Sequence, residues 1–340
     1  MTNKKRWIWI GILVILLLVG LGRLVFMQQE RQNRQAVSVV DDKTGDNDEN
    51  YRTLIYEGLT YTYNPQITTI LCAGVDSEDG LVTNNRYSIA PRADAVELVV
   101  FDNYHKKISV LAISRDTITQ VGRYTMNGNF RGVYDTQLGY AYSYGDGGKV
   151  SCENLLDSVS GILGGIPIHE YVITNCGSIK RINDLVGGVT VTVPNDDLVE
   201  MYPELVSGRR VKLDHSNVED FVRWRDVNIS FSNNGRMERQ QAFSTEFLSL
   251  FLEQVQDQPE TVWDEIDSMK DGIQTSITKN QYLNLISYLS ENRFSETDYY
   301  YLSGKDVVGD DHDEVYLNEE GKLKTILNLF YLKDGDESNE

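Results

Sequence analysis

The stretch RADAVELVVFDNYHKKISVLAISRD, residues 92–116, contains two apolar runs separated by a short polar segment. Ala95–Phe101 and Ile108–Ile113 have the length and the β-branched content that are typical of strands. The polar connection, 102–107, is short enough for a hairpin. We therefore expect the two strands to be antiparallel neighbours in one sheet.

Further strands and helices are legible on both sides of this hairpin. Short apolar runs predict strands at Ile67–Val75, Val189–Val193 and Phe221–Arg225. Apolar residues at helical spacing predict helices at Ser151–Leu163, Ser178–Leu185, Met237–Val255, Lys279–Glu291 and Glu319–Leu329, the last two capped by Thr278 and Asn318. This mixture of strands and helices predicts an α/β fold, an αβα sandwich in which helices flank a mixed central sheet. We expect it to form one domain over residues 51–333.

The N-terminal residues differ from the rest of the chain. Residues 7–27 are apolar apart from Arg23, and they are long enough to span a hydrocarbon core of about 30 Å as a transmembrane anchor. Basic residues within 1–6 predict a cytoplasmic N-terminus, and the polar segment 28–50 predicts a flexible stalk before an extracellular domain. A cleaved signal peptide is the alternative, but its nearest cleavage-type sequence, Gly20–Gly22, lies within the apolar stretch.

Composition narrows the classes of partner. The chain has 340 residues and a formal net charge of −19, which argues against nucleic acid. Residues 334–340 form an acidic segment that we expect to fray. The three cysteines are too few and too scattered for a disulfide framework, and no spacing suggests zinc. Cys72 is expected in the core, and a single bridge between Cys152 and Cys176 is conceivable.

Arginines gather in four short segments of this acidic chain. Guanidinium groups that gather against the prevailing charge typically bind an anion with several oxygens, such as phosphate or pyrophosphate. Carboxylates among them suggest a divalent metal that bridges to the anion. The pairs are Arg92 with Asp94, Arg115 with Asp116, Arg223 with Arg225, and Arg236 with Arg239.

Each segment also has a purely structural interpretation. Arg92 and Asp94 share a face of extended chain, and a surface ion pair between them would contribute well under about 1 kcal/mol. Arg223 and Arg225 project from one face of the predicted strand, where they repel each other unless an anion or a nearby carboxylate lies between them. Asp76 follows a strand, so it either forms a turn or faces the rim of the sheet where ligands bind.

The longest predicted helix combines polar and aromatic positions. Arg236 and Gln240 lie one turn apart at its start, where backbone N–H groups favour an anion, although a solvated surface explains them equally. Phe243, Phe247 and Phe251 form one stripe, either part of the core or the wall of an apolar channel. The chain contains no P-loop, no G-x-G-x-x-G and no G-x-S-x-G motif, which argues against nucleotide enzymes and triad hydrolases.

Taken in order, these segments resemble the LytR-CpsA-Psr family of cell-envelope proteins. The matching stretches are Ile70–Ser77, Arg92–Asp94, Ser109–Thr117, Gly139–Gly145, Ile166–Val193, Phe221–Arg225 and Gly235–Gln241. The resemblance implies a phosphotransferase that moves an anionic glycopolymer, such as teichoic acid or capsule, from a polyprenyl-pyrophosphate carrier to peptidoglycan with Mg²⁺. It also implies a protein anchored in the cell membrane of a Gram-positive bacterium, with its domain outside.

The resemblance assigns roles to matching residues. Asp76 and Asp94 would hold Mg²⁺ on the pyrophosphate, and Asp94, Arg115 and Arg236 would form the catalytic group. Phosphate oxygens would be bound by Arg92, Arg115, Arg223, Arg225, Arg236 and Gln240. Apolar residues behind them, with Phe243 and Phe247 as candidates, would enclose the polyprenyl chain.

One departure from the family pattern affects the chemistry. Family members usually carry an aspartate shortly before the glycine-arginine of the long helix, whereas this chain has Asn233-Asn234 before Gly235. An amide cannot act as a carboxylate base. Two alternative functions therefore stay open, a non-catalytic binder of lipid-linked pyrophosphates with a regulatory or scaffolding role, and a pyrophosphatase that uses water as the acceptor.

Overall fold

The computed structural model describes residues 53–292, 297–310 and 312–333. The predicted cytoplasmic segment 1–6, anchor 7–27, stalk 28–50 and tail 334–340 lie outside the described residues. Within the described ranges, no helix has both the length and the apolar character needed to cross a bilayer.

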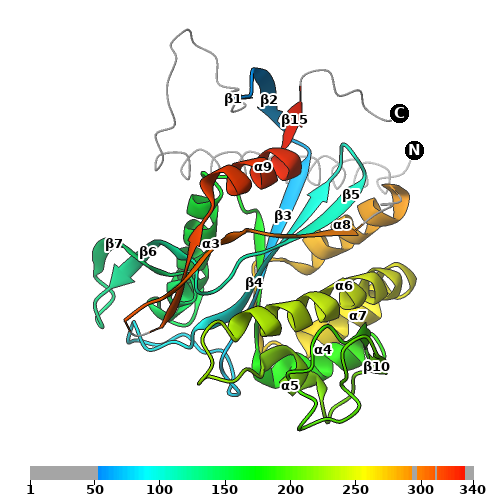
Figure 1. The fold of residues 1–340 in the computed structure, drawn as a ribbon. Helices are drawn as coiled ribbons and strands as arrows, with labels where there is room; N and C mark the ends of the chain where they lie inside the picture. Colours follow the sequence, from blue (N-terminus) through cyan, green and yellow to red (C-terminus); the bar gives the residue numbers. More distant parts are fainter. Residues whose placement is uncertain (1–52, 293–296, 311, 334–340) are drawn as a thin grey trace, which may run out of the picture. The chain divides into compact units, whose positions relative to one another are not determined.

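A six-stranded mixed sheet forms the centre of the fold (Figure 1). Its strands, in spatial order, are β11 (Ile273–Thr275), β8 (Glu170–Asn175), β3 (Ile67–Val75), β4 (Ala93–Asp102), β5 (Lys107–Ala112) and β12 (Thr297–Tyr301). Strands β3, β4 and β5 pair antiparallel, which confirms the predicted hairpin. Strand β8 runs parallel to β3 and β12 runs parallel to β5, so the sheet is mixed as expected.

Helices cover both faces of this sheet, because its strands alternate apolar residues between two sides. Leu98 and Val100 belong to a core cluster shared with α3 (Lys149–Ile162) and α9 (Glu319–Phe330). Val99 and Phe101 belong to a second cluster on the opposite face, shared with α6 (Asn233–Asp257), α7 (Pro259–Asp267) and α8 (Lys279–Asn292). This three-layer arrangement agrees with the predicted αβα sandwich.

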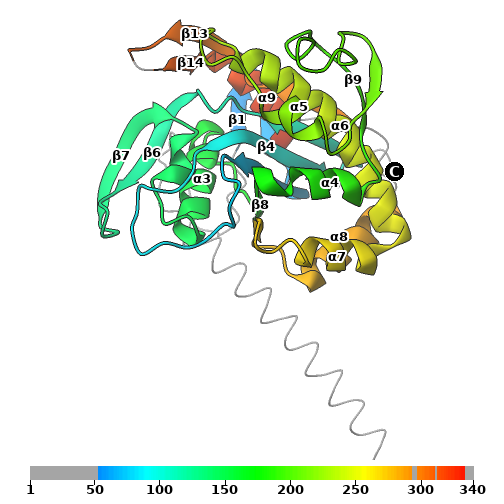
Figure 2. The same ribbon diagram turned by 90° about the horizontal axis from the view of Figure 1, so that it is seen from below.

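A third cluster lies between α6 and a small subdomain that packs on it (Figure 2). It is built from α4 (Ile179–Leu185), which follows the short 3-10 turn η1 (Cys176–Ser178), from α5 (Val218–Arg223), and from a two-stranded sheet of β9 (Thr190–Thr192) and β10 (Arg210–Lys212). The predicted strand at Val189–Val193 therefore exists, but it pairs with β10 and not with the central sheet.

Three further small sheets surround this framework. They are the hairpin of β6 (Ile118–Tyr124) and β7 (Phe130–Gln137), followed by the short helix α2 (Tyr140–Ser143); the pair β13 (Gly304–Val308) and β14 (Asp313–Leu317); and the sheet of β1 (Thr53–Tyr56), β2 (Leu59–Tyr63) and β15 (Tyr331–Lys333). The caps predicted for the last two long helices are present. Asn318 accepts from the backbone N–H of Gly321 (2.7 Å), and Thr278 accepts from that of Gln281 (3.3 Å).

The strand predicted at Phe221–Arg225 is wrong, because residues 218–223 form helix α5. Val218, Phe221 and Val222 are buried at the i, i+3, i+4 spacing of a helix and complete the third cluster. Arg223 also pairs with Glu219 one turn earlier, which a strand would not allow.

Two smaller expectations are corrected. Helix α6 begins at Asn233, so Gly235 and Arg236 lie inside its first turn. Cys152 and Cys176 are both free, so the conceivable bridge between them is absent. The thiol of Cys176 instead donates to the carbonyl of Ser77 at 2.8 Å.

Candidate anion-binding and catalytic site

Asp94, near the start of β4, joins two arginines that are far apart in the sequence. Its Oδ2 accepts from Nη1 of Arg236 at 2.8 Å, and its Oδ1 pairs with Nη1 of Arg115. Burial opposes ionisation of this carboxyl, but Arg236 and Arg115 outweigh it and hold the pKa of Asp94 below its ordinary value. Asp94 is therefore an anion at neutral pH.

Arg236 lies almost completely within the protein, with 2% of its surface exposed. Besides Asp94, its guanidinium donates to Oδ1 of Asn233 from Nε (3.1 Å) and from Nη2 (2.8 Å). Burial, together with the positive charges of Arg115 and Arg225, lowers the pKa of Arg236, while Asp94 opposes that change. A guanidinium stays charged under such conditions, so the site holds a buried cation surrounded by other cations.

A second carboxylate supports the arginines from behind. Asp116, which is buried, accepts from Nδ2 of Asn233 at 2.9 Å, from Nε of Arg115 at 3.3 Å and from Nε2 of Gln137 at 3.3 Å. Burial by itself would lower the pKa of Arg115, but the negative charges of Asp94 and Asp116 outweigh burial and raise that pKa. Asn233 thus links Asp116 to Arg236 through one amide.

Two further arginines lack a carboxylate partner in the part of the chain that the structure describes. Nη1 of Arg225 donates only to the hydroxyl of Ser232, at 3.3 Å. Arg92 donates to the hydroxyl of Tyr140 at 3.2 Å and lies over that ring, 4.9 Å from its centroid. Positive charge therefore exceeds negative charge here, which is the electrostatic condition for binding an anion.

Asp76 and Arg223 form a neighbouring group at the same edge of the sheet. Strands β3 and β4 pair there, and the N–H of Asp76 donates to the carbonyl of Arg92 at 3.0 Å. Nη2 of Arg223 donates to Oδ1 of Asp76 at 2.9 Å, and its Nη1 pairs with Glu219. The structure therefore brings the residues of the predicted phosphate site to one edge, with Arg223 already paired with the carboxylates of Asp76, Glu219 and, at 3.9 Å, Glu78.

The predicted metal ligands meet the donor requirement only in part. No group of three or more His, Cys, Asp or Glu side chains suited to a metal occurs among residues 53–292, 297–310 and 312–333. Asp76, however, leaves 57% of its side chain exposed beside the arginines. Mg²⁺ is commonly bound by one or two carboxylates and completed by substrate phosphates, so these oxygen donors fit a metal that arrives with a pyrophosphate.

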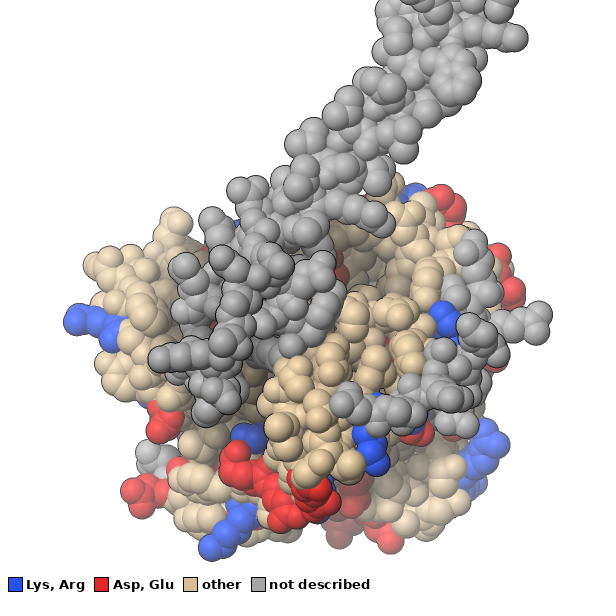
Figure 3. Space-filling model, turned by 90° about the horizontal axis from the view of Figure 1, so that it is seen from above, with Lys and Arg blue, Asp and Glu red and all other residues tan. Residues whose placement is uncertain are grey.

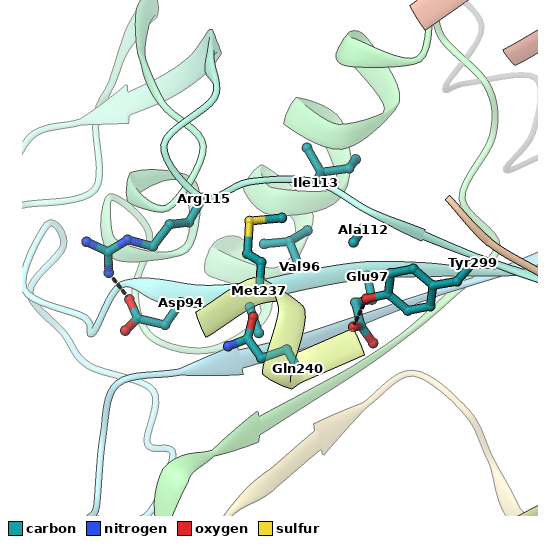
Figure 4. Close-up of a pocket in the computed structure, with 10 residues that line it drawn as sticks. Asp94, Val96, Glu97, Ala112, Ile113, Arg115, Met237, Gln240 and Tyr299 are labelled. Carbon is teal, nitrogen blue, oxygen red and sulfur yellow. Dashed lines mark hydrogen bonds and ion pairs between the residues drawn. The ribbon is translucent and has the colours of Figure 1, made fainter. Parts of the chain in front are cut away.

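A narrow pocket leads from the arginines along the inner face of α6 (Figure 4). Asp94 and Arg115 line one end, Glu97 and Tyr299 the other, and Gln240 lies between them. Its volume, about 10 Å³, has room for roughly one water molecule. The amide of Gln240 donates to the carbonyl of Val222 at 3.0 Å, so this donor is already engaged.

At the far end of this pocket, Glu97 forms no ion pair with any cation among the described residues. The hydroxyls of Tyr299 and Ser244 donate to its Oε1. Burial raises the pKa of Glu97, and these two hydrogen bonds offset only part of the effect. The pocket thus has a charged end at Asp94 and an end at Glu97 that favours a neutral acid.

The phenylalanine stripe of α6 forms a continuous stack. The rings of Phe243 and Phe247 are 5.7 Å apart and those of Phe247 and Phe251 are 5.6 Å apart, with interplanar angles of 13° and 18°. All three rings are half-buried and pack on the third cluster. The stripe therefore serves the core, and its contact with a lipid stays a prediction.

Arg239, which belonged to the sequence cluster, has a structural role. It is fully buried, and its Nε donates to the carbonyl of Phe221 at 2.9 Å. Its Nη1 pairs with Asp197 and with Oδ1 of Asn195, and its Nη2 donates to the carbonyl of Trp224. These contacts fix the chain between α5 and α6, so Arg239 is not available to a ligand.

Sequence reasoning missed three contributors to the site. Tyr140 follows Gly139 in a stretch that was used for the family resemblance, but no role was given to its ring. Glu97 interrupts an otherwise apolar strand, which was a usable signal. Asn233 was noted only as a departure, whereas its amide is the central hydrogen-bonding group behind Arg236.

Charged side chains on one face of the protein do not form a large basic patch. On the face shown in Figure 3, Lys and Arg side chains are separated from one another, and the largest group of Asp and Glu lies at the lower edge of the view. The arginines of the site gather locally in a chain whose formal net charge is −19.

Known proteins share sequence with this chain over limited regions. TagU of Halalkalibacterium halodurans, a polyisoprenyl-teichoic acid–peptidoglycan teichoic acid transferase, is 32% identical over 124 residues, which cover 36% of this chain and 34% of that protein. An uncharacterized protein of Staphylococcus aureus is 30% identical over 132 residues, 38% of this chain and 29% of that protein. The matches span about a third of these relatives' lengths.

Solved structures share the fold at lower identity, and a family match covers most of the sequence. TagT bound to LI-WTA has a TM-score of 0.58 at 17% identity and covers 78% of this chain and 90% of TagT. Bacillus subtilis TagV has a TM-score of 0.57 at 20% identity, with 78% and 96% covered. The LytR_cpsA_psr family model matches residues 27–329. The protein therefore belongs to the LytR_cpsA_psr family.

Proposed function

We propose that this protein is a membrane-anchored, extracellular phosphotransferase. It would transfer an anionic glycopolymer, such as teichoic acid or capsule, from a polyprenyl-pyrophosphate carrier to peptidoglycan. Family membership and the similarity to TagU support a transferase of cell-wall polymers. The observation that carries the proposal is the convergence of three arginines from distant segments: Arg115 and Arg236 both pair with Asp94, and the charge of Arg225 acts on Arg236.

Binding of the pyrophosphate follows from this charge distribution. Arg225 and Arg92 have no described carboxylate to neutralise them, so they are the first groups available to phosphate oxygens. Arg236 is fixed by Asn233 and Asp94, so its charge acts from a preorganised position at no cost in reorganisation. Mg²⁺, when bound by Asp76 and Asp94 with the pyrophosphate, would supply further neutralisation of phosphate charge.

The proposed reaction is a displacement at phosphorus. A hydroxyl oxygen of the peptidoglycan acceptor bonds to the phosphorus next to the glycan, and the bond from that phosphorus to the bridging pyrophosphate oxygen breaks. Polyprenyl phosphate leaves with the bridging oxygen, and the arginines stabilise the charge that develops on the non-bridging oxygens. The acceptor loses one proton, which passes to water at this open edge of the site, where 57% of the Asp76 side chain is exposed.

A non-catalytic binder is the second candidate, and Asn233 is the observation that favours it. This amide occupies the region where family members usually carry an acid, and it is buried between Asp116 and Arg236. Binding of an anion needs only the arginines, whereas proton transfer needs a base.

One assay separates these functions. The full chain in detergent would be given a lipid-linked glycopolymer, a peptidoglycan acceptor and Mg²⁺. Polymer on the acceptor supports the transferase, free phosphorylated glycan indicates a pyrophosphatase, and tight binding without turnover indicates the binder. If neither binding nor turnover occurs, the arginine site does not recognise a lipid-linked pyrophosphate.

A further inference from the structure

A continuous series of arginine and tyrosine side chains runs from Arg92 away from the site. The guanidinium of Arg92 lies over the ring of Tyr140, and this ring stacks on Tyr144 with centroids 5.5 Å apart and planes 13° apart. Arg123 then lies between two rings, 5.0 Å from the centroid of Tyr144 and 5.2 Å from that of Tyr134. We call these five residues the Arg–Tyr ladder.

The near end of the ladder is fixed to the site by the backbone. Gly139 donates its N–H to the carbonyl of Arg115 at 2.8 Å, and its own carbonyl accepts from the N–H of Ala93 at 3.0 Å. A Cβ at Gly139 would lie 3.0 Å from the carbonyl oxygen of Ala93, so this close approach favours glycine. Tyr140 follows directly, so the backbone that carries the first ring of the ladder is held next to that of Arg115.

The far end lies on the β6–β7 hairpin, which Figure 2 shows on the side of α3 opposite to α7 and α8. Arg123 and Tyr134 are exposed there, Tyr134 with 47% of its surface. Nη2 of Arg123 donates to the hydroxyl of Tyr144 at 3.1 Å. The hairpin therefore continues the series of contacts from Arg92 to an exposed surface of the protein.

Acidic groups near this hairpin act apart from the ladder cations. Asp135 points to the strand face opposite to that of its ladder neighbour Tyr134. Burial, together with the charges of Asp157 and Glu153 on α3, raises the pKa of Tyr124, so these charges act at Tyr124. Within the described residues, neither Arg92 nor Arg123 forms an ion pair with a carboxylate.

We propose that the Arg–Tyr ladder binds the phosphate-linked sugar repeats of the glycopolymer beyond the pyrophosphate. The inference rests on the proposed function, because it identifies the ligand by continuity with that site. A guanidinium stacked on an aromatic face keeps N–H groups at its edge for phosphate oxygens, beside the one that Arg92 and Arg123 each donate to a tyrosine hydroxyl. The exposed ring of Tyr134 offers the C–H groups of sugars the apolar face that Arg123 does not cover. Two cations separated by aromatic rings thus match a chain in which phosphates and sugars recur.

The test measures binding of a polymer that lacks the lipid and the pyrophosphate. The probe is a poly(glycerol phosphate) oligomer with glucosyl side groups, titrated into the full chain in detergent by calorimetry. Arg123→Ala and Tyr134→Ala should each weaken binding about tenfold, as expected for loss of one charge-assisted contact or one stacked group. Arg123→Lys should recover only part of the affinity, because it restores the charge without the planar stack.

A matched control lies on the same hairpin. Arg131 is exposed and its side chain contacts no ladder residue, so Arg131→Ala removes the same charge and should leave binding within a factor of about two. Rising salt should weaken binding to the unaltered chain. Equal affinity for neutral dextran, preferential binding of soluble peptidoglycan strands, or full affinity in Arg123→Ala and Tyr134→Ala would overturn the proposal.

This experiment is independent of catalysis. Arg225→Gln acts on the pyrophosphate site and should leave binding of the lipid-free probe unchanged, even if no transfer activity is ever observed. With a lipid-linked substrate, Arg123→Ala should raise KM for a long polymer and leave both KM and kcat unchanged for a lipid-linked disaccharide, whose two sugars would engage only the near end of the ladder at Arg92 and Tyr140. An equal loss on both substrates would contradict the ladder and place Arg123 in the pyrophosphate site.

Discussion

Asn233 accepts two hydrogen bonds from the buried guanidinium of Arg236, at 3.1 Å from Nε and 2.8 Å from Nη2. The other end of the same amide donates to Asp116 at 2.9 Å. An asparagine can satisfy a cation and an anion at once, whereas an aspartate here would place two carboxylates in contact. The residue that departs from the family pattern therefore stabilises the arginine on which the site depends.

Replacing Asn233 should destabilise the fold through Arg236. In Asn233→Ala, two buried donors of Arg236 lose their acceptor, and we expect the free energy of unfolding to fall by roughly 2–4 kcal/mol. Urea denaturation followed by tryptophan fluorescence measures this. Asn234→Ala is the matched control, because the exposed Asn234 contacts only Asp306 and its loss should cost less than about 0.5 kcal/mol. Similar losses in both variants would show that the buried bridge has no special value.

The Asp94 carboxylate should make stability depend on pH. Its pKa is lowered in the folded protein, so its contribution is complete above the unfolded pKa of about 3.9 and is lost as the pH falls through the folded value. Asp94→Asn should lower the free energy of unfolding by about 2–3 kcal/mol at pH 7 and flatten its decline in acid. Urea midpoints between pH 3 and pH 7 test this, and parallel pH profiles for the two proteins would refute it.

Glu97 should have the opposite dependence. Its pKa is raised by burial, so the folded state holds the proton more tightly, and stability should decrease as the pH rises above the unfolded pKa of about 4.3. Glu97→Gln mimics the protonated acid and should be more stable than the original at pH 8 but equal to it at pH 4. Tyr299→Phe is the complementary variant, since it removes a donor that favours the ionised form. Thermal unfolding at the two pH values distinguishes these outcomes, and a Glu97→Gln effect that is the same at both would argue against titration of Glu97.

Arg225 offers the cleanest separation of binding from stability. Within the described residues its side chain makes one hydrogen bond, to Ser232, so Arg225→Gln should leave the melting temperature nearly unchanged. Loss of one charged donor should weaken binding of a polyprenyl pyrophosphate about tenfold to a hundredfold. Arg209→Gln removes the same charge from an exposed position in the β9–β10 subdomain and serves as the control. Isothermal titration with the lipid in detergent gives both affinities, and equal affinities would remove Arg225 from the site.

Much of the fold follows from local patterns in the chain. The apolar runs of residues 92–116 and their short polar connection predicted the β4–β5 hairpin, because strand alternation and turn length act within a few residues. Helices α3, α8 and α9 were equally visible from their spacing. The strand predicted at Phe221–Arg225 was wrong, since an alternating pattern over only five residues is compatible with a strand and with part of a helix. Only packing of Phe221 against the third cluster selects the helix.

The sequence by itself determined the elements, their order, the family and the identity of the arginines that gather against an acidic composition. The tertiary structure decided which of those arginines serve a ligand. Arg236 and Arg239 lie three residues apart and are both buried. Arg236 pairs with Asp94 in the site, whereas Arg239 pairs with Asp197 and donates to backbone carbonyls. The reason is physical: the energy of a buried charge depends on its partners, and those partners come from strands and loops distant in the chain.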